Sequence, residues 1–388
     1  MNLRYLALAA AGGSAFIDMY ATQPLLPELR TTFGALAAAV SATISMLTFG
    51  CAIAAPFVGP VADRIGRKRI IVAAIALLGL VTFAAASATT LGALVAWRFV
   101  QGSFMPAVFA VTLAYIAEEV PAVVGGRAIG AYIGGNVFGG FLGRWVSALV
   151  ADRYDWHTAF VVLGVLNFIG ATIVFAALPR SRNFTRSASL AATFAAMRAF
   201  ARDPVLLAIY AVGGSILFML VATFTYATFY LHEPPFSLGT AALGNVFFVY
   251  LAGVVATPLA GRLIDRLGHR FTLLLALAAS TLGLLVTLAP SLPFVIGGLA
   301  LMSTGVFCAQ AASQGFIGVV ATSQRSSAAA LYIMVYYVGG GIGALAPAGA
   351  WSHGGWPATV ALVLAVEIVA AAIAWFLWPA RSSAAHLR

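Results

Sequence analysis

One stretch of this chain indicates its fold: Pro56-Phe57-Val58-Gly59-Pro60-Val61-Ala62-Asp63-Arg64-Ile65-Gly66-Arg67-Lys68-Arg69. A second copy begins 202 residues later and reads Pro258-Leu259-Ala260-Gly261-Arg262-Leu263-Ile264-Asp265-Arg266-Leu267-Gly268-His269-Arg270. Both copies follow the pattern P-x-x-G-x-x-x-D-R-x-G and continue into basic residues. Five identities at one fixed offset are not expected by chance. The chain is therefore predicted to contain two copies of one structural unit.

The composition is that of a membrane protein. Hydrophobic residues make up 62% of the 388 residues and charged residues only 8%. The apolar runs are continuous and about 20 residues long, which is enough for a helix to cross a bilayer. They do not alternate with period two, so helices are expected instead of a transmembrane barrel.

Breaks at proline, glycine and charged residues divide the chain into twelve expected spans, so the predicted fold class is an all-α membrane protein with twelve transmembrane helices. The expected spans are 5–25, 37–58, 70–88, 92–115, 127–150, 158–178, 205–231, 239–260, 271–289, 293–318, 327–350 and 357–378.

The basic residues predict the orientation. With twelve spans, 17 of the 21 Lys and Arg residues fall on one side, and only Arg30 and Arg153 fall in loops on the other. Loops rich in Lys and Arg stay in the cytoplasm, so both termini are expected on the cytoplasmic side of the cell membrane. The net charge of +10 therefore reflects orientation, and no nucleic-acid partner is expected.

The repeat extends beyond the opening motif. At an offset of 200, Tyr132, Gly139, Gly140, Gly143 and Trp156 match Tyr332, Gly339, Gly340, Gly343 and Trp356. Two halves of six helices with the same orientation imply a pseudo-twofold axis along the membrane normal. The predicted domains are an N-terminal bundle at 1–178, a cytoplasmic linker at 179–204 and a C-terminal bundle at 205–388.

At these residues the chain resembles the major facilitator superfamily over essentially its whole length. The family's loop signature G-x-x-x-D-R-x-G-R-[KR] is met by Gly59, Asp63, Arg64, Gly66, Arg67 and Lys68, and its weaker second copy by Gly261, Asp265, Arg266 and Gly268. A second family pattern, R-x-x-Q-G, is present at residues 98–102. The wording of residues 20–27 and 134–144 is similar to the bacterial efflux-permease group of the YnfM type. The resemblance implies a bacterial inner-membrane protein that transports by alternating access, with proton antiport and efflux.

One departure from the family leaves a second function open. Proton-coupled exporters of the family carry a proline in G-x-x-x-G-P-x-x-G-G of helix five, where this chain has Asn136. The leading hypothesis is a proton-coupled exporter of small organic molecules, with protons and a small-molecule cargo as partners. The alternative is an importer or facilitator of a sugar, organic acid or amino-acid-like solute. An enzyme is not expected, because no nucleophile with a partner base is visible.

Asp18 is the expected proton carrier. Ionisable groups at membrane depth are rare and are functional candidates by default. The alternative is a hydrated residue near the mouth of the path. Arg98 could hold an anionic substrate, pair with Asp18, or serve as a hydrogen-bonded strut between helices. The polar and aromatic residues predicted to line the substrate cavity are Tyr20, Gln23, Arg98, Gln101, Asn136, Tyr226 and Tyr336.

The resemblance also implies a gate at the two loop motifs. A carboxylate such as Asp63 would cap a helix N-terminus of the other half while the cytoplasmic side is closed. The alternative is a solvated turn with weak charge pairs. Glu118 and Glu119 are expected to pair with the neighbouring arginines, and the glycines at 130–143 and 339–343 are expected to be helix-packing faces. No metal site, cofactor or disulfide is expected, and the protein is expected to act as a monomer in the bilayer.

Overall fold

The computed structural model describes residues 3–181, 195, 197–321 and 325–378. These residues form helices joined by short connections, and none of them lies in a strand. Nine of the described helices are long and apolar enough to cross a membrane, and two shorter apolar helices accompany them, at Leu3–Ile17 and Thr240–Gly253. The fold is that of an all-α membrane protein.

The chain divides into two compact units. The first comprises Met1–Ala192 with Leu238–Asn245, and the second Thr193–Ser237 with Val246–Arg388. The predicted domains at 1–178 and 205–388 stay a prediction. The predicted linker at 179–204 falls mainly on residues 182–194 and 196, which lie outside the described part of the chain.

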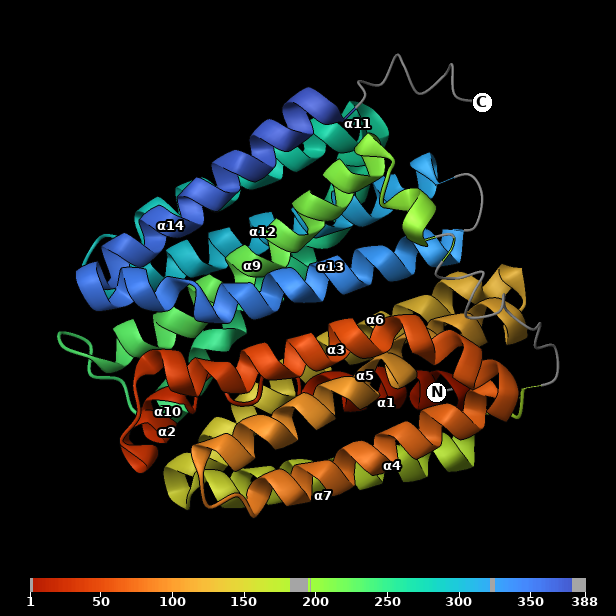
Figure 1. The fold of residues 1–388 in the computed structure, drawn as a ribbon, viewed down its shortest axis with the longest axis horizontal. Coiled ribbons are helices and arrows are strands. Elements are labelled where there is room, and N and C mark those ends of the chain that lie inside the picture. The colour runs from red at the N-terminus through yellow and green to blue at the C-terminus, as the bar shows by residue number, and fades with distance from the viewer. Residues whose placement is uncertain (1–2, 182–194, 196, 322–324, 379–388) are drawn as a thin grey trace. The chain divides into compact units, whose positions relative to one another are not determined.

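The first unit is a bundle of long helices (Figure 1). Its helix α1 packs against α6 and α7, α3 packs against α5, and α4 packs against both α5 and α7. The short α2 follows α1 and contacts α3. The bounds are α1 Leu3–Ile17, α2 Leu26–Phe33, α3 Ala37–Ile65, α4 Arg67–Ala86, α5 Leu91–Glu119, α6 Ala122–Arg153 and α7 Trp156–Ala177.

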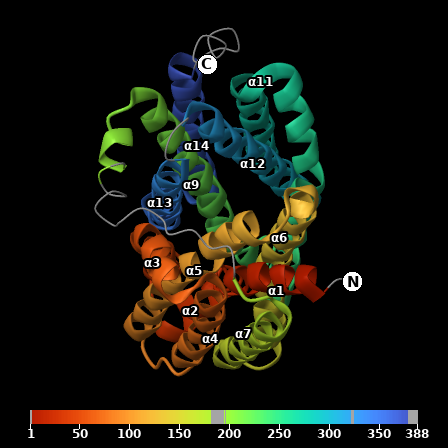
Figure 2. The same cartoon turned by 90° about the vertical axis from the view of Figure 1, so that its right-hand side faces the viewer.

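The second unit repeats this arrangement (Figure 2). Its helix α9 packs against α13 and α14, as α1 packs against α6 and α7, and α11 packs against α12 and α14. The bounds are α9 Pro204–His232, the 3-10 turn η1 Phe247–Val249, α11 Tyr250–Val286, α12 Leu292–Val320, α13 Arg325–Leu345 and α14 Pro347–Leu377. The short α10, Thr240–Val246, precedes η1 and belongs almost entirely to the first unit.

Glycines bring the first and fifth helices of each repeat into backbone contact. A Cβ on Gly139 of α6 would lie 2.5 Å from the Cα of Gly13 in α1. A Cβ on Gly339 of α13 would lie 2.6 Å from the Cα of Gly214 in α9. Only glycine, which has no side chain, permits this approach. In lipid there is no hydrophobic force between helices, and close van der Waals packing of this kind holds them together instead. The predicted packing faces are confirmed at these contacts, whereas a Cβ on Gly130 or Gly134, in the same predicted run, would meet nothing within 4 Å.

The helix breaks agree with the expected spans in two places and differ in one. The breaks expected between residues 260 and 271 and between 350 and 357 are kinks with non-helical backbone, at Gly268 within α11 and at Gly354 and Gly355 within α14. The first expected span, at 5–25, is broken, because helix α1 ends at Ile17.

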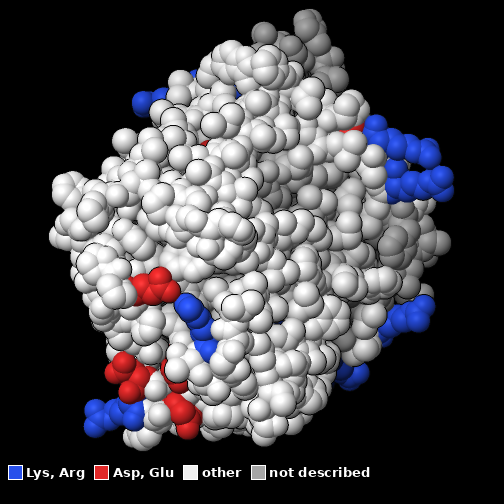
Figure 3. Space-filling model, turned by 60° about the vertical axis from the view of Figure 1, so that its left-hand side comes forward, with Lys and Arg blue, Asp and Glu red and all other residues white. Residues whose placement is uncertain are grey.

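Charged side chains are few on the face in Figure 3, and broad uncharged surface separates them. The exposed hydrophobic residues include many on the outer sides of the spans, such as Phe175, Val255, Leu282 and Phe376. Such surface suits hydrocarbon, as expected for helices that face lipid.

Candidate functional site: a buried polar network around the broken first span

The helix of the first span is interrupted within its apolar sequence. Helix α1 ends at Ile17, residues 18–25 form successive turns, and α2 begins at Leu26. Pro24 lacks an N–H group, and its ring clashes with the carbonyl that a continuous helix would place four residues before it. Asp18 was expected inside this helix, but it lies immediately after its end. The prediction of one continuous helix to residue 25 is therefore wrong.

The broken segment is buried, so each of its backbone carbonyls needs a donor. Asp18, Thr22 and Gln23 are fully buried, and an unsatisfied carbonyl away from water costs as much as a lost hydrogen bond. Turn hydrogen bonds from within the chain serve the carbonyls of Asp18, Tyr20, Thr22 and Gln23, while those of Met19 and Ala21 accept from side chains. The side-chain donors come from α5 and α6.

Arg98 of α5 supplies most of them. Its Nη1 donates to the carbonyl of Asp18 at 2.8 Å, and its Nη2 donates to the carbonyl of Met19 at 2.9 Å. Its Nε donates to the carbonyl of Thr43 in α3 at 3.1 Å, and Nη1 also reaches the Gln101 side chain at 2.8 Å. Arg98 is fully buried. These contacts are those of the strut that the sequence left as one alternative.

The carboxyl group of Asp18 has a separate set of partners. Its Oδ2 accepts hydrogen bonds from the amide of Asn167 in α7 and from the hydroxyl of Thr82 in α4, at 2.5 and 3.2 Å. Thr82 in turn accepts from the amide of Gln101 at 2.7 Å. The other oxygen, Oδ1, is buried and has no hydrogen-bond partner. The network therefore links the carboxyl of Asp18 to Arg98 through Thr82 and Gln101.

A second cluster holds the rest of the broken segment. Arg144 of α6 donates to the side chain of Gln23 at 2.8 Å and lies over the ring of Tyr20, with its Cζ 4.7 Å from the ring centroid. Ser147 donates to the carbonyl of Ala21 at 2.8 Å. The structure therefore brings Tyr20 and Gln23 together as predicted neighbours, and it adds Arg144 and Ser147 to them.

The remaining predicted cavity residues lie apart from this network. Asn136 lies in α6 where α6 approaches α1, and its Oδ1 is buried without a hydrogen-bond partner. Tyr226 of α9 donates to the carbonyl of Ala344 in α13 at 3.2 Å, and Tyr336 packs against Tyr332. Both tyrosines are buried in the second unit. The assignment of these residues to a substrate cavity stays a prediction.

The two loop motifs have matching backbone turns. Gly66 has a φ of 97° and Gly268 a φ of 83°. A positive φ is accessible to glycine at little cost and strained for other residues, which explains the glycine in both copies. Gly59 and Gly261 lie within α3 and α11, and Arg64 is exposed at the end of α3. The side chain of Asp63, on which the predicted latch depends, lies outside the described part of the structure.

The first motif carries an ion pair. Arg67 is buried and binds Glu118 of α5 with two hydrogen bonds, from Nε at 3.1 Å and from Nη2 at 2.8 Å. The expected pairing of Glu118 is confirmed. Lys68 lies over the ring of Phe175, 5.5 Å from its centroid.

The second motif differs at these positions. His269 packs against Phe316 of α12, with ring centroids 5.3 Å apart. Asp265 and Arg266 are exposed on α11 before the turn at Gly268. An aromatic contact therefore occupies the place where the first motif has an ion pair.

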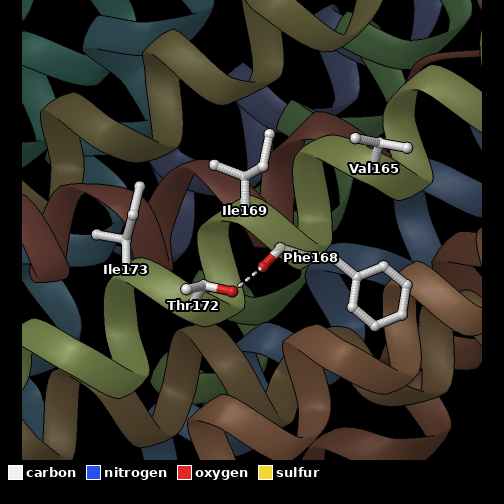
Figure 4. Close-up of a pocket in the computed structure, with 5 residues that line it drawn as sticks. All are labelled: Val165, Phe168, Ile169, Thr172 and Ile173. Atoms are coloured by element: carbon white, nitrogen blue, oxygen red, sulfur yellow. Dashed lines mark hydrogen bonds between the residues drawn. The ribbon is translucent and has the colours of Figure 1, made fainter.

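A pocket on α7 was not predicted (Figure 4). It is lined by Val165, Phe168, Ile169, Thr172 and Ile173, which lie along one side of α7. Within the described residues, no group of three or more His, Cys, Asp and Glu side chains could hold a metal ion.

Sequence reasoning missed Thr82, Asn167 and Ser147. Asn167 had a visible signal, because it is the one amide side chain in an otherwise apolar span. Hydroxyl residues such as Thr82 and Ser147 give no such signal, since they occur in many membrane helices and bond their own backbone there.

A bundle of membrane-spanning helices built from two repeats, with a loop motif at the same place in each, defines a class of transporter. The family model of the Major Facilitator Superfamily matches residues 8–249 and 235–387, and the chain belongs to this family. The protein is therefore a multi-pass membrane transporter.

Similar proteins agree with this assignment. The chain is 31% identical over 366 residues to the inner membrane transport protein YnfM of Escherichia coli K12, covering 94% of this chain and 88% of that protein. The solved structure of the nucleoside transporter NupG matches with a TM-score of 0.78 at 17% identity, covering 97% of this chain and 100% of that one. A D-xylose-proton symporter matches with a TM-score of 0.77 at 16% identity, covering 98% and 99%. The two solved structures show the fold alone.

Proposed function

We propose that this protein is a proton-coupled exporter of small organic molecules that works by alternating access, with Asp18 as its proton carrier. One observation carries the proposal: the carboxyl of Asp18 is fully buried, and one of its oxygens has no hydrogen-bond partner. A buried charge is costly, so binding or releasing a proton there changes the energy of the surrounding structure.

The hydrogen-bond network can pass the effect of protonating Asp18 to other helices. Asn167 and Thr82 donate to the Asp18 carboxylate, and donation to a charged acceptor is stronger than donation to a neutral acid. When Asp18 is protonated, these donors are held less firmly. Since Thr82 also binds Gln101, which binds Arg98, the change reaches the side chain that holds the broken segment.

The loop motifs serve as gates in this proposal. Asp63 would act as a latch through the helix dipole while the cytoplasmic side is closed. We expect Asp63→Asn and Gly59→Leu to slow transport strongly while the protein stays folded. Transport by Asp63→Asn at the wild-type rate would show that the motif determines only topology.

The topology of the proposal places both termini in the cytoplasm. Single cysteines at Phe33 and Pro235 are expected to react with a membrane-impermeant reagent from outside, and a cysteine at Leu190 only from inside. Labelling from the opposite side at any of the three positions contradicts this orientation.

A second function is favoured by Asn136. It stands at the position where proton-coupled exporters of the family carry proline, and its Oδ1 is buried without a partner. The alternative is a facilitator or importer of a sugar, organic acid or amino-acid-like solute. The similarity to a D-xylose-proton symporter and a nucleoside transporter concerns the fold and does not choose between the two functions.

The deciding experiment uses proteoliposomes with an imposed proton gradient. Cargo is first found by a thermal-shift screen of small organic molecules on the purified protein. Wild type is expected to move cargo against its gradient, and Asp18→Asn, which mimics the protonated acid, is expected to lose this while still exchanging cargo down its own gradient. Glu233→Gln, after α9 in the second unit, is the control. Export by Asp18→Asn that still depends fully on the proton gradient would exclude Asp18, and wild-type transport without such dependence would favour the facilitator.

A further inference from the structure

The second unit contains a buried carboxyl group that is not part of the hydrogen-bond network around Asp18. Glu367 of α14 is only 2% exposed. Its Oε2 accepts a hydrogen bond from the hydroxyl of Thr281 in α11 at 3.0 Å. Its Oε1 is buried without a hydrogen bond, and so is the hydroxyl of Ser280, the residue next to Thr281. The hydroxyl of Ser280 lies beside the carboxyl of Glu367, so a carboxyl group and two hydroxyl groups meet where α14 packs on α11.

The internal repeat places this site in register with the Asp18 network. Glu367 lies 200 residues after Asn167, the same offset that relates Trp156 to Trp356 and Gly139 to Gly339. Both Asn167 and Glu367 lie on the last helix of their unit. Asn167 donates to the carboxyl of Asp18, which also accepts from Thr82 of α4. Glu367 itself accepts from Thr281, in the part of α11 after Gly268.

The buried carboxyl group lies on a different helix in each of the two repeats. Gly13 and Gly214 make equivalent contacts with Gly139 and Gly339, so the residue equivalent to Asp18 is Met219, which is fully buried. In the first unit the carboxyl is on the first helix and the amide is on the last. In the second unit the carboxyl is on the last helix and a methionine is on the first. Each unit thus has one buried carboxyl at this layer.

The partners of Glu367 suit both of its protonation states. A hydroxyl group can donate one hydrogen bond and accept others. A charged Glu367 can accept from both Ser280 and Thr281, and a neutral Glu367 can donate its own proton to one of them and accept from the other. A single proton shared between Oε1 and Ser280 would satisfy the two buried atoms that now lack a partner.

No ion pair with Glu367 competes with a proton among the described residues. The ionisable residues on the helices packed against α14 are Tyr210, Tyr226, Tyr230 and His232 on α9, with Asp203 at its N-cap; Tyr250, Arg262, Asp265, Arg266, His269 and Arg270 on α11; and Arg325, Tyr332, Tyr336 and Tyr337 on α13, where the side chain of Arg325 lies outside the described part of the structure. The nearest cation along α11 is Arg270, eleven residues before Thr281, or about 16 Å of helix. Arg270 instead contacts Trp375 and Trp378 near the end of α14.

We propose that Glu367, Ser280 and Thr281 form a second proton-binding site of this transporter, inside the C-terminal unit. The occupant is a proton on the carboxyl of Glu367, with the two hydroxyls as its hydrogen-bond partners. The site binds and releases this proton whether or not Asp18 does. Its use in coupling rests on the function proposed above.

The test is labelling with dicyclohexylcarbodiimide, which reacts with a protonated carboxyl in an apolar environment. The purified wild-type protein is labelled over a range from acidic to alkaline pH, and peptide mass spectrometry gives the labelled fraction of Glu367 and Asp18 separately. Labelling of Glu367 is expected to be high at acidic pH and to fall about tenfold for each pH unit above its midpoint, as for a single titrating group.

Two hydroxyl variants test the two carboxyl groups separately. Thr281→Val is expected to displace the midpoint for Glu367 to higher pH, because the hydroxyl stabilises the charged carboxylate more than the neutral acid. Thr82→Val, which removes a hydrogen-bond donor to Asp18, is expected to leave the Glu367 curve unchanged. Glu367→Gln confirms the assignment by removing the label from its peptide.

The outcomes separate the two proposals. Labelling of Glu367 that is absent at every pH, or that does not change with pH, would overturn the second proton site, and the wild-type protein alone decides this. A titrating Glu367 beside an Asp18 that never labels would leave the second site standing and remove the support for Asp18 as carrier. The reverse pattern would do the opposite.

Discussion

The glycine contact between α1 and α6 allows one structural statement to be tested without knowing the cargo. In Gly139→Ala, the added Cβ would lie 2.5 Å from the Cα of Gly13 and closer still to its carbonyl oxygen. Carbon atoms pack best at about 3.5–4 Å, so the two helices must separate by roughly 1 Å. The atoms in the way are backbone atoms, which cannot rotate aside.

The expected cost follows from this clash. Overpacking of a well-packed interface costs about 1–3 kcal/mol, while replacing glycine by alanine within a helix contributes about 0.5–1 kcal/mol in the opposite direction. Gly134→Ala, five residues earlier in α6, is the matched control, because a Cβ there meets nothing within 4 Å. The alanine gain is common to both variants, so their stabilities should differ by about 1–3 kcal/mol.

Thermal unfolding of the purified protein in detergent measures this difference. For a unit of this size, about 1 kcal/mol shifts the Tm by roughly 2–4 °C, so Gly139→Ala should unfold several degrees below Gly134→Ala. Gly339→Ala, the equivalent change in the second unit, should behave like Gly139→Ala. If Gly139→Ala and Gly134→Ala unfold at the same temperature, the close approach of α1 and α6 is not present in the protein.

Three further predictions concern polar contacts. Arg98→Met removes four hydrogen bonds, and at about 0.6 kcal/mol each in a membrane it should lower the free energy of unfolding by about 2–3 kcal/mol, which an unchanged unfolding transition would contradict. Glu118→Gln breaks the ion pair with Arg67 and should lower the free energy of unfolding by about 1–3 kcal/mol. A variant as stable as wild type at both low and high salt would show that this pair adds nothing. Asp155 caps α7 by accepting from the N–H of Thr158 at 2.6 Å, and these hydrogen bonds hold the pKa of its carboxyl below its usual range. Asp155→Ala should therefore cost about 0.5–2 kcal/mol at neutral pH. Because the depressed pKa belongs to the folded state, this contribution is present above the unfolded value and is lost as the pH falls through the folded value, so the difference from wild type should vanish in acid; a difference that persists there contradicts the assignment.

The features that sequence could predict are those encoded by local pattern or by the repeat. Apolar runs indicated the spans, and the duplicated motif indicated two equivalent units. Gly66 and Gly268 required a backbone angle that glycine adopts readily, and both have a positive φ. Glu118 was expected to pair with a nearby arginine because both lie at helix ends on the same side, and the structure shows the pair with Arg67.

The break after Ile17 could be predicted only in part. Pro24 is a local sign that a helix cannot continue unchanged, but the helix already ends at Ile17. The side chains that donate to the irregular backbone are Arg98, about 80 residues later, and Ser147, more than 120 residues later. Their acceptors are main-chain carbonyls, which every residue has, so no side-chain pattern marks them. The hydrogen bond between Glu367 and Thr281 joins side chains 86 residues apart, and no local pattern indicates it.

The dependence of residues 18–25 on α5 and α6 also has a consequence for biosynthesis. When the first span enters the membrane, Arg98, Arg144 and Ser147 have not yet been translated, so the carbonyls of Met19 and Ala21 lack the side-chain donors they have in the folded protein. Backbone in lipid must satisfy itself within its segment, and we therefore expect helix α1 of the nascent span to extend beyond Ile17 toward Pro24 and to unwind there only after α6 has been inserted. Cysteine accessibility at residue 22 in chains arrested before and after residue 153 would follow this remodelling, and an unchanged pattern between the two lengths would show that the break forms without its distant donors.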